Sequence, residues 1–239
     1  SKRWIFIKVS GSKTHIPEWK GLLMYPFHIS SVIRDQKLTN IYCMELFEKY
    51  KKWGKNITIF DVDDTLIVTK SKIKVFNPKT GYEIDLTPQE FNTFKTKPHD
   101  KFDFNDFRDL EILKAGKIID WVFNILKRTI SKGTAVGIIT ARDDSKLIYD
   151  FLLHNGVDVN PDFIFAINDP NLGFTGSTAQ KKKEGFMKFV QMGFRNFKFF
   201  DDDRENIKIA NSLNKELPDI KMNATLIKQK WIPNFNDFS

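Results

Sequence analysis

The sequence predicts an α/β protein built on a doubly wound parallel sheet. The first observation is a set of short segments that are apolar on both faces, as buried parallel strands are. These segments are residues 56–60, 134–140, 162–167 and 197–200. The second observation is helical periodicity in the stretches between and after them, at residues 110–131, 144–154, 180–192 and 204–215. Strands that alternate with helices indicate βαβ units, and such units form a parallel sheet.

Two segments are expected to lie outside this alternation. An insertion follows the first strand, at about residues 66–108. It opens with two alternating stretches on either side of "NPKTG" (77–81), a pattern that predicts a β-hairpin. We therefore expect a basic extension over residues 1–55 and one α/β domain over residues 56–239, with 66–108 as a flap or small cap.

The positive charge is concentrated at the N-terminus. Residues 1–55 hold 11 Lys and Arg against 4 Asp and Glu, a difference of +7, while the other residues hold 27 against 26, a difference of +1. The basic residues alternate with aromatic ones, and this mixture suits base stacking together with phosphate contacts. The same aromatic residues also suit the core of a small sheet. The charge asymmetry predicts that residues 1–55 face an anionic partner such as nucleic acid.

The composition predicts a cytoplasmic protein without a membrane span. No apolar run approaches eighteen residues, and the apolar patch near the N-terminus is too short for a secretory signal. The single cysteine, Cys43, excludes an internal disulfide and is compatible with a reducing compartment. The sequence does not indicate an oligomeric state.

Polar residues follow three of the predicted strands directly. They are Asp61-Val62-Asp63, Thr140-Ala141-Arg142 and Asp201-Asp202-Asp203. The carboxyl ends of parallel strands meet at one edge of a sheet, which is where ligands bind in this class of fold. Crowded carboxylates repel one another and raise one another's pKa values. A cation is therefore expected among them.

The order of these motifs resembles that of the haloacid dehalogenase (HAD) superfamily of phosphotransferases. The matching pieces are "DVDDT" (61–65), "IIT" (138–140), a lysine at 181–183 and "FFDDD" (199–203). The resemblance covers about residues 56–215, and the predicted hairpin is similar to the "squiggle and flap" of the superfamily. Asp64 stands where many members have Gly.

The resemblance implies a Mg²⁺-dependent phosphatase that forms an aspartyl-phosphate. Asp61 would be the nucleophile, and Asp63 would protonate the leaving group and then activate water. Thr140 would hydrogen-bond a phosphoryl oxygen. The Mg²⁺ ligands would be Asp61, the backbone carbonyl of Asp63 and a carboxylate of the fourth motif.

The fourth motif leaves alternatives open. The resemblance favours Asp202 as the metal ligand, with Asn206 as a further polar residue and Asp201 as a supporting partner. Asp203 is either part of this cluster or the N-cap of the following helix.

The phosphate-binding lysine is one of three neighbours, Lys181, Lys182 and Lys183. Lys183 begins "KEGF", 19 residues before Asp202, a spacing similar to that of the phosphatase half of phage polynucleotide kinase-phosphatases. We therefore prefer Lys183. The segments "DLTPQEFNTF" and "FDFNDFRD" also resemble HAD-type proteins of large tailed phages, which implies the host cytoplasm if the chain is phage-encoded.

Arg142 and Arg204 are candidates for substrate binding, because either could pair with a second phosphate. The alternative for Arg142 is an ion pair with Asp143 or Asp144. A small insertion implies an open site that admits a phosphorylated nucleotide or a nucleic-acid end. The alternative functions are a phosphatase of proteins or small metabolites, and a HAD-fold binding or scaffold protein without turnover.

Overall fold

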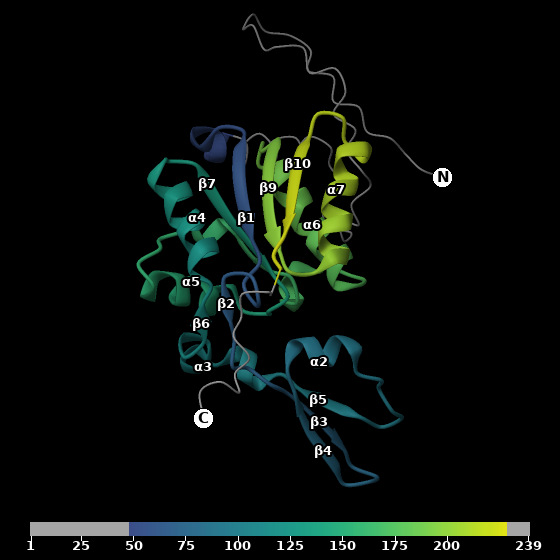
Figure 1. The fold of residues 1–239 in the computed structure, drawn as a ribbon. Coiled ribbons are helices and arrows are strands. Elements are labelled where there is room, and N and C mark those ends of the chain that lie inside the picture. The colour runs from purple at the N-terminus through teal and green to yellow at the C-terminus, as the bar shows by residue number, and fades with distance from the viewer. Residues whose placement is uncertain (1–47, 229–239) are drawn as a thin grey trace, which may run out of the picture.

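The computed structural model describes residues 48–228, and a five-stranded sheet forms its centre (Figure 1). The strands are β1 (Asn56–Phe60), β7 (Ala135–Thr140), β8 (Ile164–Ala166), β9 (Asn196–Asp201) and β10 (Lys221–Leu226). Their order is β10-β9-β1-β7-β8, and every neighbouring pair is parallel. The predicted α/β class with a parallel sheet is confirmed. The predicted basic extension lies outside the described residues except for residues 48–55.

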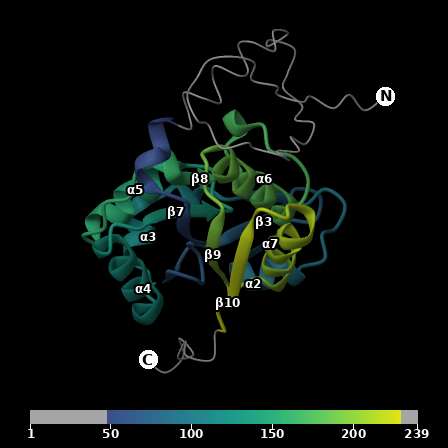
Figure 2. The ribbon, with the colours of Figure 1, turned by 90° about the horizontal axis from the view of Figure 1, so that it is seen from above.

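Four helices cover the two faces of this sheet. They are α4 (Asp120–Ser131), α5 (Ser145–His154), α6 (Thr178–Gln191) and α7 (Arg204–Glu216). Helices α4 and α5 connect β1 to β7 and β7 to β8 and lie on one face, while α6 and α7 lie on the other (Figure 2). The sheet is therefore doubly wound, as predicted. No helix within residues 48–228 is long and apolar enough to cross a membrane.

The strand order creates a switch point between β1 and β9. From β1 the chain moves to β7 and β8 on one side of the sheet, and it then crosses back to β9 and β10 on the other side. In open α/β sheets the connections diverge at such a point and leave a crevice outside the carboxyl ends of the strands. The fold itself therefore indicates where to look for a site.

The insertion after β1 forms a second, smaller sheet. Its strands are β3 (Ile73–Asn77), β4 (Tyr82–Leu86) and β5 (Lys101–Asp103), in the order β4-β3-β5. The antiparallel pairing of β3 with β4 confirms the predicted hairpin. Helix α2 (Pro88–Thr93) starts with a capping box between Thr87 and Glu90. Figure 1 shows this unit beyond the carboxyl ends of the central strands.

The predicted helix over residues 110–131 is wrong as a single element. The structure has α3 (Leu110–Lys114), then β6 (Lys117–Ile118), and only then α4. Strand β6 pairs antiparallel with β2 (Ile67–Val68). Gly116 allows this close approach, because a Cβ atom there would lie 2.8 Å from the backbone oxygen of Val68. Four short 3₁₀ helices lie at Lys51–Trp53, Asn105–Arg108, Pro161–Phe163 and Pro170–Leu172, and residues 48–50 are α-helical.

Candidate functional site

The first and fourth motifs emerge side by side at the switch point. Phe60 of β1 is in register with Phe200 of β9, and their rings stack with centroids 5.1 Å apart. The next residues along the two strands are Asp61 and Asp201, and the backbone N–H of Asp61 donates to the carbonyl of Phe200 at 3.0 Å. Both carboxylates are almost completely buried. Two neighbouring parallel strands therefore deliver two acidic side chains to one place.

Lys182 of α6 supplies the positive charge between these two carboxylates. Its Nζ atom lies 2.8 Å from Oδ1 of Asp61 and 2.6 Å from Oδ2 of Asp201, and its side chain is only 2% exposed. The pKa of Lys182 is lowered by burial, but the charges of Asp201 and Asp61 outweigh burial and the net shift is upward. The ammonium group is therefore held in its charged form at the centre of the site.

The preference for Lys183 is corrected by this geometry. The Nζ atom of Lys183 lies 2.7 Å from Oε1 of Glu216 on α7, and Lys181 instead donates to Asn168 at 2.8 Å. Consecutive residues on an α-helix point about 100° apart, so only one of three neighbouring lysines can face the strand ends. Here that lysine is Lys182.

Burial and crowding shift the acidic groups of the site. Burial raises the pKa of Asp61 well above its usual range; Lys182 opposes this shift, and the neighbouring carboxylates add to it. Burial and the charges of Asp201 and Asp64 raise the pKa of Asp202 to about 7. A divalent cation would relieve this repulsion, as the opposite charge of Lys182 does in part.

The carboxylates of Asp61, Asp201 and Asp202 could hold a metal ion, since one oxygen of each lies within 4.8 Å of the others. An all-oxygen donor set suits Mg²⁺. The Asp201 carboxylate already accepts from Lys182, from Nδ2 of Asn206 at 3.0 Å and from the backbone N–H of Asp203 at 2.8 Å. Asp202 makes no ion pair within residues 48–228. This difference is compatible with Asp61 and Asp202 as the metal ligands and with Asp201 as the residue that orients Lys182 beside them.

Three neighbouring residues have local structural roles. Asp203 is the N-cap of α7 and accepts from the backbone N–H groups of Glu205 and Asn206. The amide group of Asn206 donates to Asp201. Asp64 has a positive φ of 56°, a left-handed conformation that Gly adopts freely and Asp tolerates. The backbone at this position therefore explains why either Gly or Asp can stand there.

Arg142 was expected either to bind a second phosphate or to pair with Asp143 or Asp144, and in the structure it pairs with Asp63 instead. Its guanidinium forms an ion pair with Asp63 and is almost completely buried, whereas Asp143 pairs with Arg108. It is therefore neither exposed for a second phosphate nor paired with an adjacent aspartate. The sequence could not reveal this contact, because the partners are 79 residues apart.

The other two candidates lie at the ends of secondary-structure elements. Thr140 ends β7 with its side chain fully buried, and its Oγ1 accepts from the backbone N–H of Arg142 at 3.4 Å. Its hydroxyl proton remains available for a hydrogen bond. Arg204 is exposed at the first turn of α7 and makes no ion pair within the described part of the chain.

Comparison with known proteins adds little to this geometry. No family model matches the sequence, and no curated protein is a significant match. One solved structure that matches is a Vibrio cholerae protein described as a "putative 3-deoxy-D-manno-octulosonate 8-phosphate phosphatase". The identity is 15%, the TM-score is 0.25, and the match covers 70% of this chain and 65%, just under two thirds, of the other. A likeness this distant carries no argument about function.

Proposed function

We propose that the protein is a Mg²⁺-dependent phosphomonoester hydrolase that works through an aspartyl-phosphate on Asp61. The observation that carries this proposal is the cluster at the switch point, where Lys182 lies between Asp61 and Asp201 and Asp202 adjoins them. The motif order, which resembles that of the HAD superfamily, assigns Asp61, Asp202 and one lysine of 181–183 to phosphoryl transfer, and the geometry selects Lys182 as that lysine.

The first half of the reaction transfers the phosphoryl group to the protein. An oxygen of Asp61 attacks phosphorus, and the bond from phosphorus to the leaving oxygen breaks. Asp63 gives its proton to that oxygen, so the product leaves as a neutral alcohol. Lys182 and the Thr140 hydroxyl stabilise the negative charge on the phosphoryl oxygens.

The second half returns the protein to its starting state. Asp63, now a carboxylate, takes a proton from water as the water oxygen attacks phosphorus. The bond between phosphorus and Asp61 breaks, and inorganic phosphate leaves. A Mg²⁺ ion bound by Asp61 and Asp202 would supply charge neutralisation between the attacking carboxylate and the anionic phosphate.

The substrate class that we propose is a phosphorylated nucleotide or nucleic-acid end. Its support is the charge of +7 on residues 1–55 and the small size of the insertion. A panel of 3′- and 5′-phosphorylated oligonucleotides, nucleoside monophosphates, phosphopeptides and small sugar phosphates tests it. Preference for a phosphopeptide or a sugar phosphate would contradict this substrate class and leave the reaction type intact.

The reaction type is tested with 4-nitrophenyl phosphate. Hydrolysis should require Mg²⁺, stop in EDTA and fall by several orders of magnitude in Asp61→Asn, because that change removes the nucleophile from residues that act as a unit. Asp109→Asn is a matched control, since Asp109 caps α3 outside the cluster. Activity that persists in EDTA or in Asp61→Asn would rule out this mechanism.

A further inference from the structure

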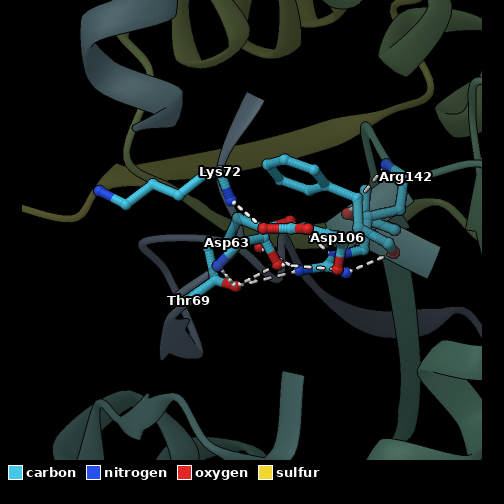
Figure 3. Close-up of polar contacts among 8 residues, drawn as sticks. Asp63, Thr69, Lys72, Asp106 and Arg142 are labelled. Atoms are coloured by element: carbon cyan, nitrogen blue, oxygen red, sulfur yellow. Dashed lines mark hydrogen bonds and ion pairs between the residues drawn. The ribbon is translucent and has the colours of Figure 1, made fainter. Parts of the chain in front are cut away.

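Arg142 makes polar contacts with three separate parts of the chain (Figure 3). Its Nε and Nη2 atoms donate to the two carboxylate oxygens of Asp63 at 2.9 and 2.7 Å. Nη2 also donates to Oγ1 of Thr69 at 3.3 Å, and Nη1 donates to the carbonyl of Phe107 at 2.6 Å. The guanidinium also lies 5.0 Å from the centroid of the Phe107 ring. Its orientation is therefore determined by contacts on its edge and on its face.

These contacts join the two ends of the insertion to the strand ends. Thr69 lies just after β2, and Phe107 lies in the 3₁₀ helix Asn105–Arg108 at the far end. Asp106 strengthens this junction by accepting from the backbone N–H of Lys72 at 3.0 Å. Arg142 itself follows β7 by two residues. The guanidinium therefore donates hydrogen bonds to both ends of the insertion while it forms the ion pair with Asp63.

The two members of the ion pair differ in exposure. The side chain of Arg142 is 1% exposed, whereas that of Asp63 is 18% exposed. Only the carboxylate can therefore meet a substrate directly. Each carboxylate oxygen that accepts one hydrogen bond from Arg142 still has a second lone pair, which can bind the proton that Asp63 gives to the leaving oxygen.

We propose that Arg142 is a positioning residue, which fixes the Asp63 carboxylate so that one oxygen points at the leaving group. This inference rests on the proposed function, because the proposed function makes Asp63, the residue through which Arg142 acts, the general acid. An aspartate side chain has several rotamers, and proton transfer requires the carboxyl oxygen within hydrogen-bond reach of the leaving oxygen. A bidentate guanidinium fixes both the position and the plane of the carboxylate, which a lysine cannot do.

Two substrates with different leaving groups test this role. Nitrophenolate leaves without a proton at neutral pH, whereas an alkoxide from an alkyl phosphate must be protonated as it leaves. In Arg142→Gln, the first step with an alkyl phosphate should slow by about 100-fold, the lower end of the range for general acid catalysis. With 4-nitrophenyl phosphate, a burst of one nitrophenolate per active site should remain, followed by slow turnover, because Asp63 also serves the second step.

Matched variants separate positioning from other roles. Arg108→Gln removes an exposed arginine that pairs with Asp143 and should behave as wild type. Asp63→Asn should show the same dependence on the leaving group as Arg142→Gln, and the double variant should be no slower than Asp63→Asn alone. Arg142→Lys keeps the charge without the bidentate geometry, and it should show the same dependence on the leaving group to a smaller extent. This variant replaces Arg142→Gln in the test if Arg142→Gln does not fold.

Three results would overturn the inference. Equal loss on both substrates through KM would show that Arg142 binds the phosphate, and no change would show that it is dispensable. Faster turnover would show that the pair restrains Asp63. If the wild type hydrolyses nothing, the proposed function fails by itself. In that case a crystal structure of Arg142→Lys tests the positioning role separately. The Asp63 carboxylate should leave its wild-type position in this variant, and an unchanged carboxylate would overturn the inference.

Discussion

Lys182 carries a positive charge that is almost completely removed from water. Its Nζ atom lies 2.8 Å from Asp61 and 2.6 Å from Asp201, and it also lies over the ring of Phe199, 5.9 Å from the ring centroid. An ammonium group in such a place is stable only because it is paired. The same is true in reverse, since each carboxylate would be a buried charge without an opposite charge beside it if the lysine were removed.

We predict that Lys182→Met and Lys183→Met differ sharply although the residues are adjacent. Removing one member of a buried ion pair costs about 3–5 kcal/mol of the free energy of unfolding, and Lys182→Met should also abolish hydrolysis. Lys183 pairs with Glu216 at the surface, where such pairs contribute up to about 1 kcal/mol. Urea unfolding followed by circular dichroism measures both. Equal costs in the two variants would contradict the assignment of Lys182.

We predict that the metal-free protein loses stability as the pH rises from about 4 to 7. The pKa of Asp202 is raised to about 7 and that of Asp61 is also raised, so in this range the folded state binds more protons than the unfolded chain. Deprotonation therefore favours unfolding. Urea unfolding in EDTA at several pH values measures this slope, and it should flatten in Asp202→Asn. Stability that rises with pH across this range would contradict the raised values.

Individual site residues could be predicted from the sequence only as far as their type and position along the chain allow. Asp61 and Asp201 follow apolar strands, so their place at the sheet edge was predictable. Helical periodicity also distinguishes Lys182 from Lys181 and Lys183, because Lys182 lies four and seven residues before Phe186 and Phe189, which pack against the sheet on the same helix face. Long-range pairs such as Asp63 with Arg142 leave no trace in local spacing.

The contact between α6 and β7 determines where Lys182 points. Gly137 of β7 faces the ring of Phe189 on α6, and a Cβ atom there would lie 2.6 Å from Cζ of that ring. Gly185 of α6 approaches Ile139 of β7 more loosely, with a Cβ atom 3.2 Å from its nearest neighbour. Glycine on each side therefore brings the helix close to the sheet.

We predict that Gly137→Ala is more damaging than Gly185→Ala. The first change should cost about 1–3 kcal/mol, as overpacking in a core does, and it should lower activity because it pushes α6 and Lys182 away from the strand ends. The second should be close to neutral, since alanine gains up to about 1 kcal/mol of helix propensity while Ile139 shifts slightly. Thermal unfolding with 4-nitrophenyl phosphate hydrolysis tests both. A larger loss in Gly185→Ala would contradict this packing.

Elements with strong periodicity were predictable, and elements that depend on tertiary contacts were not. The strands over 56–60 and 134–140 are buried on both faces and read as apolar runs. Strand β10 lies at the edge of the sheet and alternates exposed with more buried residues, so a search for apolar runs does not find it, although the alternation itself is a strand signal. The break between α3 and α4 was missed because the pairing of β6 with β2 overrides helical periodicity.

The strand topology and the excess positive charge lie in different parts of the chain. The strand order brings the catalytic candidates together at the switch point, and this part of the chain is nearly neutral, with a difference of +1 over residues 56–239. A polyanionic substrate therefore gains little long-range attraction from the domain that carries the site. The excess charge on residues 1–55 could supply that attraction.

Most of this basic segment, residues 1–47, lies outside the described residues, and solution measurements can test its role. Four basic residues are changed to Gln together: Lys8, Lys13, Lys20 and Arg34. If they contact phosphates, binding of a single-stranded oligonucleotide should depend on salt with a log–log slope of about −0.7 per contact, and the variant should have a shallower slope. Turnover of a phosphorylated oligonucleotide should fall through KM, because encounter weakens while the strand ends are unchanged.

A charge-matched variant separates this segment from net charge alone. It carries four exposed lysines of the domain changed to Gln: Lys127, Lys198, Lys215 and Lys221. This variant has the same net charge, so a similar loss of oligonucleotide turnover in both would show that only the total charge matters. Hydrolysis of 4-nitrophenyl phosphate should be unchanged in both, since neither set includes a residue of the cluster. If the N-terminal variant loses both activities equally, the segment is structural. If it loses neither and no oligonucleotide binds at low salt, the basic segment serves a different partner.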